Sequence, residues 1–590
     1  MCTAAKPVQP RRQAFQGRCW RLLVAVPAAT PMMQNVAAKN ITGSAQRESD
    51  TVEPDAPGAQ APVDSPVGRA AGSHADSTDR SGAEPAGNAP TRTALQRLRP
   101  LALSWLPPLL VLLIATASFG WRYWEPQSLF WDENYHVASA YKQLEGVMYM
   151  ETHPPLGKML IALGEWATGA NAGIDPTPLL QHDHLAQSDL PPDFSFVGVR
   201  LASVLSMILA APLLFGLLRL ATGSRAVALA FTCLFVFDNA LVVHTRAAML
   251  EGMQILFALA TLYLLARALA PGGRIRLWHY LGLGLLIGLA LAVKLNAGVL
   301  LLVPPALLLV ECWPQLRERL WRPVAKRALL AGSATTLALL LIFGGVFALQ
   351  ISLSERVIDG RTYKASPEFL GALALGHGAA PSTWAVGIRD HLRYIAEYSE
   401  GVPRLDVCKP GENGSPPLHW VLGGKTINYR WNKTVENGVA EVSYTYLLGN
   451  PLVWLPVLLG LVLSGSLVVA RLIYGAPVHD RRLFLWILLM SSLYLGYMLA
   501  ILQIDRVMYL YHYLLPLVFG IVNLALVFTY LFREGLAAGR LHTRLNLVGI
   551  VGLVLAGFFW FAPFTYNQPL TEQAVEQRQW MSVWKLEPIR

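Results

Sequence analysis

Eleven apolar stretches, most of them close to twenty residues long, constrain the fold of this 590-residue chain more than any other feature. A helix of about 20 apolar residues crosses the roughly 30 Å hydrocarbon core of a bilayer. Only 15% of the residues are charged, whereas soluble proteins carry about 25%. We therefore predict an all-α polytopic membrane protein with about 11 spans, at residues 101–120, 198–218, 225–243, 248–268, 278–294, 296–312, 328–350, 451–470, 483–503, 508–532 and 545–563.

The basic residues between these stretches predict which side of the membrane each connection faces. Alternate short connections hold clusters of Arg and Lys, and the short connections between them hold only Arg246, Lys294 and Arg506. Cytoplasmic loops are the ones enriched in basic residues, so we predict a cytoplasmic N-terminus. The same distribution explains the net charge of +10 without a nucleic-acid partner.

The predicted spans divide the chain into five parts. Residues 1–100 are rich in Ala, Pro, Gly and Ser, which predicts a disordered, low-complexity cytoplasmic tail. The other parts are a membrane module at 101–350 with an outer loop at 121–197, an outer cap at 351–450, a second membrane module at 451–565 and an outer tail at 566–590. Most polar residues of the ordered part lie in the outer segments, so we expect the chemistry on the extracytoplasmic face.

Two adjacent carboxylates, Asp132 and Glu133, open the first outer loop. One of them is a candidate general base for a hydroxyl, and its neighbour is a candidate for orienting the acceptor. The alternative is a helix N-terminus, where acidic side chains complement the helix dipole.

A second candidate lies about twenty residues further on, in the segment Glu151-Thr152-His153-Pro154-Pro155-Leu156-Gly157-Lys158. The two prolines end any preceding helix and favour an extended turn. Gly157 and Lys158 then open an amphipathic stretch, where a helix terminus and a cation can meet a phosphate. The alternative is an interfacial turn in which Lys158 reaches the lipid head groups.

Ionisable residues also lie in or beside the apolar stretches: Arg200, Arg246, Glu251, Lys294, Arg506 and His512. Such groups are costly at membrane depth unless they are paired or functional, so each one is a functional candidate. For two acidic residues we expect structural pairing to be at least as good an explanation. These are Glu251, expected to pair with Arg246, and Asp238, expected to pair with another cation.

Taken together, these segments resemble the protein O-mannosyltransferase family. The resemblance rests on the Asp-Glu pair, HPPLGK at 153–158, FDNALVVHTRAAMLEG at 237–252, Val293-Lys294, LLGNPLVW at 447–454 and YHYLLP at 511–516. It departs from the family in two acidic residues, since Glu151 and Glu251 stand where the family usually has Asp. No segment is long enough for the lumenal domain of the eukaryotic members, which favours a bacterial form.

The resemblance implies a multispanning GT-C glycosyltransferase that uses a polyprenyl-phosphate sugar. It implies catalytic roles for Asp132 and Glu133, and it implies that Arg200 binds the carrier phosphate, with Lys158, His153 and Arg506 as further donor-binding candidates. Supporting candidates are Glu151, Arg246, Glu251, Lys294 and His512. The expected reaction is an inverting transfer of mannose or a related hexose to Ser or Thr hydroxyls of exported proteins, at the outer face of a bacterial cytoplasmic membrane.

Two other functions remain open at this point. One is a lipid-directed GT-C enzyme, such as an aminoarabinose–lipid A transferase, and the other is a transporter or flippase. We expect no metal and no cofactor, because no compact His/Asp cluster has ligand spacing. The expected partners are the polyprenyl-phosphate sugar, an exported protein acceptor, the lipid bilayer and, as a further candidate, the secretion translocon.

Overall fold

A computed structural model describes residues 94–436 and 439–586, with side chains at 105–435 and 441–586. The predicted N-terminal tail lies almost entirely outside the described residues. The chain divides into two units, Met1–Ser104 and Trp105–Arg590, and everything below concerns the second. This second unit holds the whole of the predicted catalytic region.

Most of the predicted spans are helices that can cross a membrane. In the described part of the chain, seven helices are long and apolar enough to do so, or eight if one bent pair counts as a span. The seven are α6 (Val197–Thr222), η2 with α11 (Leu295–Leu302 and Val303–Arg317), α12 (Trp321–Ser352), α15 (Pro451–Tyr474), α16 (Arg481–Leu502), η4 with α17 (Leu510–Tyr513 and Leu514–Leu531) and α19 (Leu541–Thr565). The bent pair is α7 (Arg225–Val236) with α8 (Asn239–Thr245), which meet at 56°.

The three other predicted spans are also helical, but they do not meet the same criteria. They are α2 (Ala94–Gly120), α9 (Glu251–Ala268) and α10 (Leu277–Val293). The chain is therefore a mostly helical multi-pass membrane protein, as predicted. The count of eleven spans stays a prediction.

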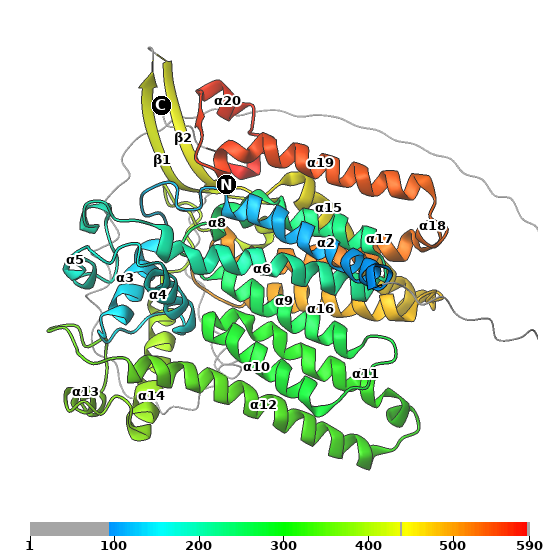
Figure 1. The fold of residues 1–590 in the computed structure, drawn as a ribbon, viewed down its shortest axis with the longest axis horizontal. Coiled ribbons are helices and arrows are strands. Elements are labelled where there is room, and N and C mark those ends of the chain that lie inside the picture. Colours follow the sequence, from blue (N-terminus) through cyan, green and yellow to red (C-terminus); the bar gives the residue numbers. More distant parts are fainter. Residues whose placement is uncertain (1–93, 437–438, 587–590) are drawn as a thin grey trace, which may run out of the picture. The chain divides into compact units, whose positions relative to one another are not determined.

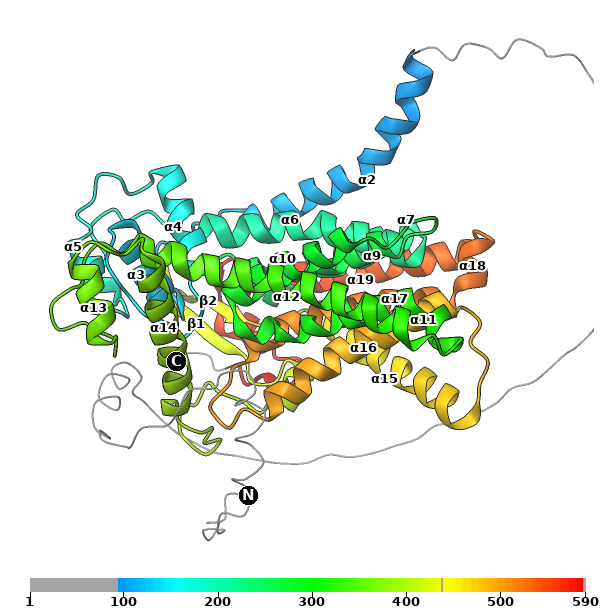
Figure 2. The same ribbon diagram turned by 90° about the horizontal axis from the view of Figure 1, so that it is seen from below.

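The long helices lie side by side in a bundle (Figure 2). α10 packs against α9 and α12, α6 packs against α9, and α17 packs against α15 and α16. Gly284 permits the close approach of α10 to α12, because a Cβ atom there would collide with the backbone oxygen of Thr335. Close helix packing fixes the positions of the loops at the ends of the bundle.

The polar segments gather at one end of the bundle, where the first loop lies beside the segment that follows α12 (Figure 2). The first loop contributes α3 (Glu133–Leu144), α4 (Leu156–Thr168), α5 (Thr177–Leu180) and η1 (Gln187–Asp189), and the later segment contributes α13 (Pro367–Ala374), α14 (Pro381–Gly401) and η3 (Pro417–Leu422). Buried Lys142 joins the two, because its ammonium group donates to Asp183 and to the hydroxyl of Tyr363. Two segments far apart in sequence thus form one surface.

A small antiparallel sheet at this end is not part of the predicted all-α fold. β1 (Ile427–Glu436) pairs with β2 (Val439–Leu447), and β2 pairs with β3 (Pro569–Leu570), as Figure 1 shows for the β1–β2 hairpin. Side chains of β2 form an apolar cluster with Phe564 and Trp584. A search for apolar stretches of spanning length passes over such strands, because their alternating pattern buries only one face. The short elements α18 (Arg533–Ala537), α20 (Glu572–Glu576) and η5 (Ser582–Trp584) complete the chain.

Two of the sequence motifs meet at the bend between α7 and α8. Asp238 accepts hydrogen bonds from the backbone N–H groups of Leu241 and Asn450 and from the indole N–H of Trp454. Asn450 in turn donates to the backbone oxygens of Phe237 and Val554. The expectation that Asp238 pairs with a cation is therefore wrong. Its carboxylate instead satisfies donors that the helix ends leave free.

Candidate active site

Asp132 occupies the N-cap position of α3, but its side chain makes no capping hydrogen bond. The carboxylate is only partly exposed, and the hydroxyl of Tyr511 lies within hydrogen-bonding reach of it. The helix-cap alternative for Asp132 therefore lacks the contact that defines a cap. The carboxylate remains available for other chemistry.

Burial raises the pKa of the Asp132 carboxyl above its ordinary value of 3.8. The positive charge of Lys294 and the hydroxyl of Tyr511 act in the opposite direction, and the negative charge of Glu251 adds to the effect of burial. A carboxylate with a raised pKa is a stronger base than an exposed Asp. These surroundings therefore suit proton removal.

Glu251 forms an ion pair with Lys294 and also contacts His244, whose Nε2 lies 2.8 Å from Glu251 Oε2. The other ring nitrogen of His244 lies 2.7 Å from the hydroxyl of Tyr429. The expected pairing of Glu251 with Arg246 is therefore wrong. Arg246 follows α8 and turns to other partners, whereas Lys294 lies at the break between α10 and η2, next to Glu251 in space.

Aromatic rings form one wall of the site around Asp132. Tyr511 stacks on Tyr509 and on His244, and the ring of Trp131 lies edge-on to both tyrosines. The ammonium group of Lys294 lies 5.1 Å from the centre of the Tyr511 ring. His512 is buried and stacks on Tyr511 and on Trp420. Stacked rings of this kind hold Tyr511 in one position.

The HPPLGK segment forms the start of α4, with Pro155 at the N-cap position. Lys158 is fully buried, and its Nζ forms an ion pair with Glu151 at 2.9 Å. A Cβ atom at residue 157 would lie 2.5 Å from a methyl group of Leu250, so glycine lets α4 lie close to the start of α9 without displacing that side chain. Lys158 therefore faces the same site instead of reaching out to lipid head groups.

His153 and His136 lie within the electrostatic reach of Lys158, Lys294 and Glu251. Burial lowers the pKa of both imidazoles well below the ordinary value of 6.5, and the two nearby ammonium groups lower it further. Both rings are therefore neutral at pH 7. Neutral imidazoles suit hydrogen bonding to hydroxyl groups better than binding to a phosphate.

Several buried polar atoms near Asp132 lack a hydrogen-bond partner among the residues that the structure describes. They are Trp131 Nε1, His136 Nδ1 and Arg506 Nε. Buried polar groups in proteins are almost always hydrogen-bonded, so each exception calls for an explanation. Three such atoms in the region of Asp132 indicate the position of a polar ligand.

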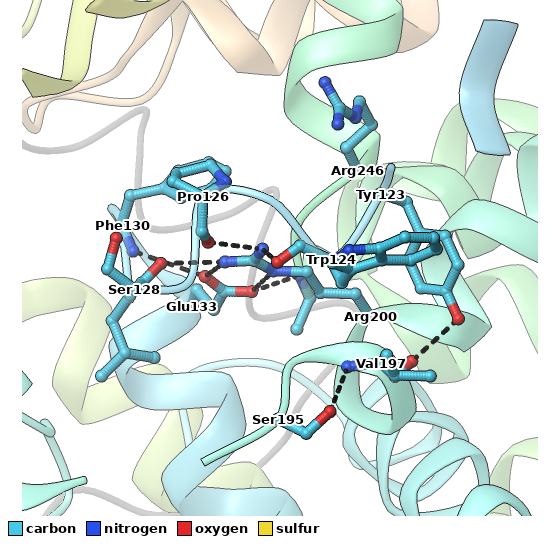
Figure 3. A network of polar contacts seen from close by, with 12 residues as sticks. Tyr123, Trp124, Pro126, Ser128, Phe130, Glu133, Ser195, Val197, Arg200 and Arg246 are labelled. Atoms are coloured by element: carbon cyan, nitrogen blue, oxygen red, sulfur yellow. Dashed lines mark hydrogen bonds and ion pairs between the residues drawn. The ribbon is translucent and has the colours of Figure 1, made fainter. Parts of the chain in front are cut away.

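Glu133 lies next to Asp132 in sequence, yet it points into a different network (Figure 3). Its two oxygens accept from Arg200 Nε at 2.7 Å and from Arg200 Nη2 at 2.9 Å, and Oε1 also accepts from the backbone N–H of Ala248 at 3.0 Å. Both side chains of this pair are fully buried. Glu133 therefore has no free oxygen directed at an acceptor.

The remaining donors of Arg200 bind the backbone just before Glu133 (Figure 3). Nη1 donates to the oxygens of Trp124 and Pro126, and Nη2 donates to the oxygen of Ser128, each at 2.9 Å. A guanidinium group has five N–H donors, and all five of Arg200 are used within the protein. The phosphate role of Arg200 stays a prediction, but this geometry favours a role in positioning the Asp132 loop.

Four residues of the site were missed by reasoning from the sequence: His136, His244, Tyr429 and Tyr511. His136 lies one helical turn after Asp132, and that spacing places the two on one face of a helix. His244 and Tyr511 lie inside motifs that were recognised. Tyr429 lies on β1, almost 300 residues after Asp132, and no signal in the sequence links the two.

A metal site is the remaining question about the chemistry of this region. Among the side chains that the structure describes, no group of three or more His, Cys, Asp or Glu residues is arranged to hold a metal ion. The arrangement that is described consists of a carboxylate with a raised pKa, neutral imidazoles and cations. Such a site can deprotonate a hydroxyl and stabilise a departing anion.

Two protein-family models match the chain. Residues 109–354 match the model "Dolichyl-phosphate-mannose-protein mannosyltransferase", and residues 406–584 match "C-terminal four TMM region of protein-O-mannosyltransferase". Together they cover most of the chain.

Individual relatives differ in how much of their length is matched. The chain is 23% identical over 508 residues to a polyprenol-phosphate-mannose–protein mannosyltransferase of Mycolicibacterium smegmatis, an alignment that covers 77% of this chain and 87% of that protein. It is 28% identical over 195 residues to dolichyl-phosphate-mannose–protein mannosyltransferase 3 of Saccharomyces cerevisiae, which covers 32% of this chain. The chain spans only a quarter of the length of that yeast relative.

The fold is similar to that of a solved structure, the S. cerevisiae protein O-mannosyltransferase Pmt1–Pmt2 complex bound to the sugar donor. The TM-score is 0.69 at 15% sequence identity, covering 83% of this chain and 93% of that chain. At this identity the similarity concerns the fold alone.

Proposed function

This chain belongs to the protein O-mannosyltransferase family, and we propose that it transfers mannose from a polyprenyl-phosphate carrier to Ser or Thr hydroxyls of exported proteins. The observation that carries the proposal is the uncapped, partly buried carboxylate of Asp132, with three unpartnered buried polar atoms in the same region. Those atoms match what a sugar phosphate needs, namely hydrogen-bonding groups for the hydroxyls and a guanidinium group for the phosphate.

The proposed reaction is a single inverting displacement. Asp132 accepts the proton of the acceptor hydroxyl while the hydroxyl oxygen attacks the anomeric carbon. The new carbon–oxygen bond forms as the bond to the carrier phosphate breaks, and the polyprenyl phosphate leaves with the electron pair. Phosphate is a good leaving group, so the enzyme mainly has to position the reactants and stabilise charge.

Arg506 is the proposed main ligand of the carrier phosphate. Its Nε lacks a partner, and no ion pair involves Arg506 among the described residues. The positive charge of Arg506 acts on the phenol groups of Tyr398 and Tyr509. The negative charge of Asp132 also acts on Tyr398. A free guanidinium can bind two phosphate oxygens at once, which Arg200 cannot do while its donors are occupied. Lys158 and His153 are the proposed sugar-side contacts.

The other two functions receive less support. Both family models, and the mycobacterial relative, carry names that describe mannose transfer to protein, which disfavours a lipid acceptor and a flippase. The decisive test is transfer by the purified protein from polyprenyl-phosphate mannose to a Ser/Thr-containing peptide. Mannosylated peptide is the expected product. Product that appears only with a lipid acceptor, or carrier movement without transfer, would contradict the proposal.

We further propose eleven spans in a bacterial cytoplasmic membrane, with the cap at 351–450 and the site on the extracytoplasmic face. The basic clusters between spans lie in connections at the end of the bundle opposite α3 (Figure 2), which supports this orientation. The secretion translocon stays a predicted partner.

The orientation can be tested with single cysteines in a chain whose five native cysteines are replaced. Glu368→Cys lies on α13 and Glu534→Cys on α18, and both native side chains are well exposed, at 67% and 75%. An impermeant thiol reagent added to intact spheroplasts is expected to label the first and to label the second only after lysis. The reverse pattern would invert the proposed orientation.

The pH dependence of transfer tests the role of Asp132. A base must be ionised, so kcat/KM should fall as the pH drops through the pKa of Asp132, and this should occur at higher pH than for an ordinary Asp. The hydroxyl of Tyr511 lowers that pKa, so Tyr511→Phe should shift the acidic limb to still higher pH. The matched control is Tyr509→Phe, because Tyr509 stacks on Tyr511 and the change removes the same kind of hydroxyl. If the acidic limb of the kcat/KM profile lies at the same pH in Tyr511→Phe as in the wild type, this would argue against Asp132 as the base.

A further inference from the structure

A cavity of about 180 Å³ lies apart from the candidate active site, where the start of the first loop meets the C-terminal tail. Its walls include Arg122, Glu125, Arg246, Tyr566, Asn567 and Gln568. One water molecule needs only about 10–15 Å³ measured in this way, so the cavity can hold a small polar group. The charged groups that act on Arg246 are Arg200, Glu125 and Arg122, a set separate from the one that acts on Asp132.

Arg246 is the feature of this cavity that requires a ligand. The residue is 4% exposed, and its Nη atoms donate to the backbone oxygens of Thr565, Trp121 and Arg122. Its Nε has no hydrogen-bond partner, and no carboxylate of the described residues lies within ion-pair distance. Glu125, the nearest carboxylate, pairs with Arg122 instead. A buried cation without a paired anion is unfavourable.

The chemistry of the walls selects an anion with several oxygens. Two guanidinium groups contribute to the lining, and the side-chain amides of Asn567 and Gln568 add further donors. Guanidinium forks match the geometry of phosphate oxygens. The cavity also lies where α2 ends at Gly120 and α19 ends at Thr565, next to the exposed ring of Trp121. Aromatic rings at span ends mark the level of lipid head groups.

We propose that this cavity binds a phosphate group, supplied either by an anionic lipid head group or by a soluble phosphate compound. The bound phosphate supplies the anion that Arg246 lacks. Arg246 and Arg200 hold successive parts of the same segment, since Arg246 binds the oxygens of residues 121 and 122 and Arg200 those of residues 124, 126 and 128. A phosphate bound in the cavity therefore stabilises the position of the segment that precedes Asp132.

The test uses a charge placed in the cavity wall. Gln568→Glu adds a carboxylate beside Arg246 without removing any of the bonds of Arg246, and the native side chain is exposed, so folding should be preserved. Gln577→Glu makes the same change at an exposed position outside the cavity and serves as the matched control. The full-length protein in detergent is titrated with phosphatidylglycerol, with diacylglycerol and with inorganic phosphate, and binding is followed by native mass spectrometry and thermal unfolding.

We expect phosphatidylglycerol, but not diacylglycerol, to bind and to raise the midpoint of unfolding. Gln568→Glu should weaken this binding at least tenfold and abolish the shift, whereas Gln577→Glu should behave like the wild type. Equal stabilisation by inorganic phosphate alone, with the same loss in Gln568→Glu, would identify a soluble phosphate as the ligand. If neither phosphate probe distinguishes Gln568→Glu from the wild type, the proposal is overturned.

Discussion

Asp132→Asn is expected to reduce transfer to a peptide acceptor by about 10²- to 10⁴-fold, the range that a general base contributes. Asn keeps the shape and the hydrogen-bonding capacity of the side chain but cannot accept a proton. Because the carboxylate makes no capping hydrogen bond, the stability of the variant should be close to that of the wild type. Transfer and thermal unfolding are measured on the same purified variants.

Two companion variants sharpen this test. Asp132→Glu keeps a carboxylate, displaced by about one methylene, and should retain part of the activity. Asp175→Asn, at an exposed position in the same loop, removes a carboxylate away from the site and should be close to wild type. If Asp132→Asn is stable and fully active, Asp132 is not the base.

Glu133→Gln is expected to act on stability, in contrast to its neighbour. The Glu133–Arg200 pair is fully buried, and removing one partner leaves the other charge uncompensated. Breaking a buried pair in this way typically costs about 3–5 kcal/mol. We therefore expect a markedly lower free energy of unfolding, with transfer lost because the loop before Asp132 is no longer held. Glu400→Gln, at an exposed position, is the matched control and should have little effect.

A double variant separates this structural role from a direct role in binding. Arg200→Gln combined with Glu133→Gln removes both charges, so its loss of stability should be smaller than the sum of the two single losses. Additive losses would show that the pair is not energetically coupled. A stable Glu133→Gln protein without activity would instead support a direct role of Glu133 in orienting the acceptor.

The mostly helical, multi-pass fold could be predicted from the sequence, and so could the gathering of the polar loop segments at one end of the bundle. Apolar stretches of spanning length predict membrane helices because the bilayer fixes the length of a span. The basic clusters predict an orientation in the same direct way. Asp132 and the HPPLGK segment were found because ionisable groups and prolines are conspicuous beside apolar stretches. Each of these signals is local, so a single sequence contains it.

The partner of each charge, by contrast, was decided only by the tertiary structure. Asp132 and Glu133 are adjacent and chemically alike, yet Asp132 is partly exposed and makes no capping bond, whereas Glu133 is buried and paired with Arg200. Glu251 was expected to pair with Arg246, five residues away in the chain, and pairs instead with Lys294, which follows α10. Packing of α4, α9 and α10 sets these contacts, because close helix approach at small residues such as Gly157 brings distant side chains together. The sequence alone determined which groups are charged and at which end of the bundle they lie, and helix packing determined which of them remain free to react.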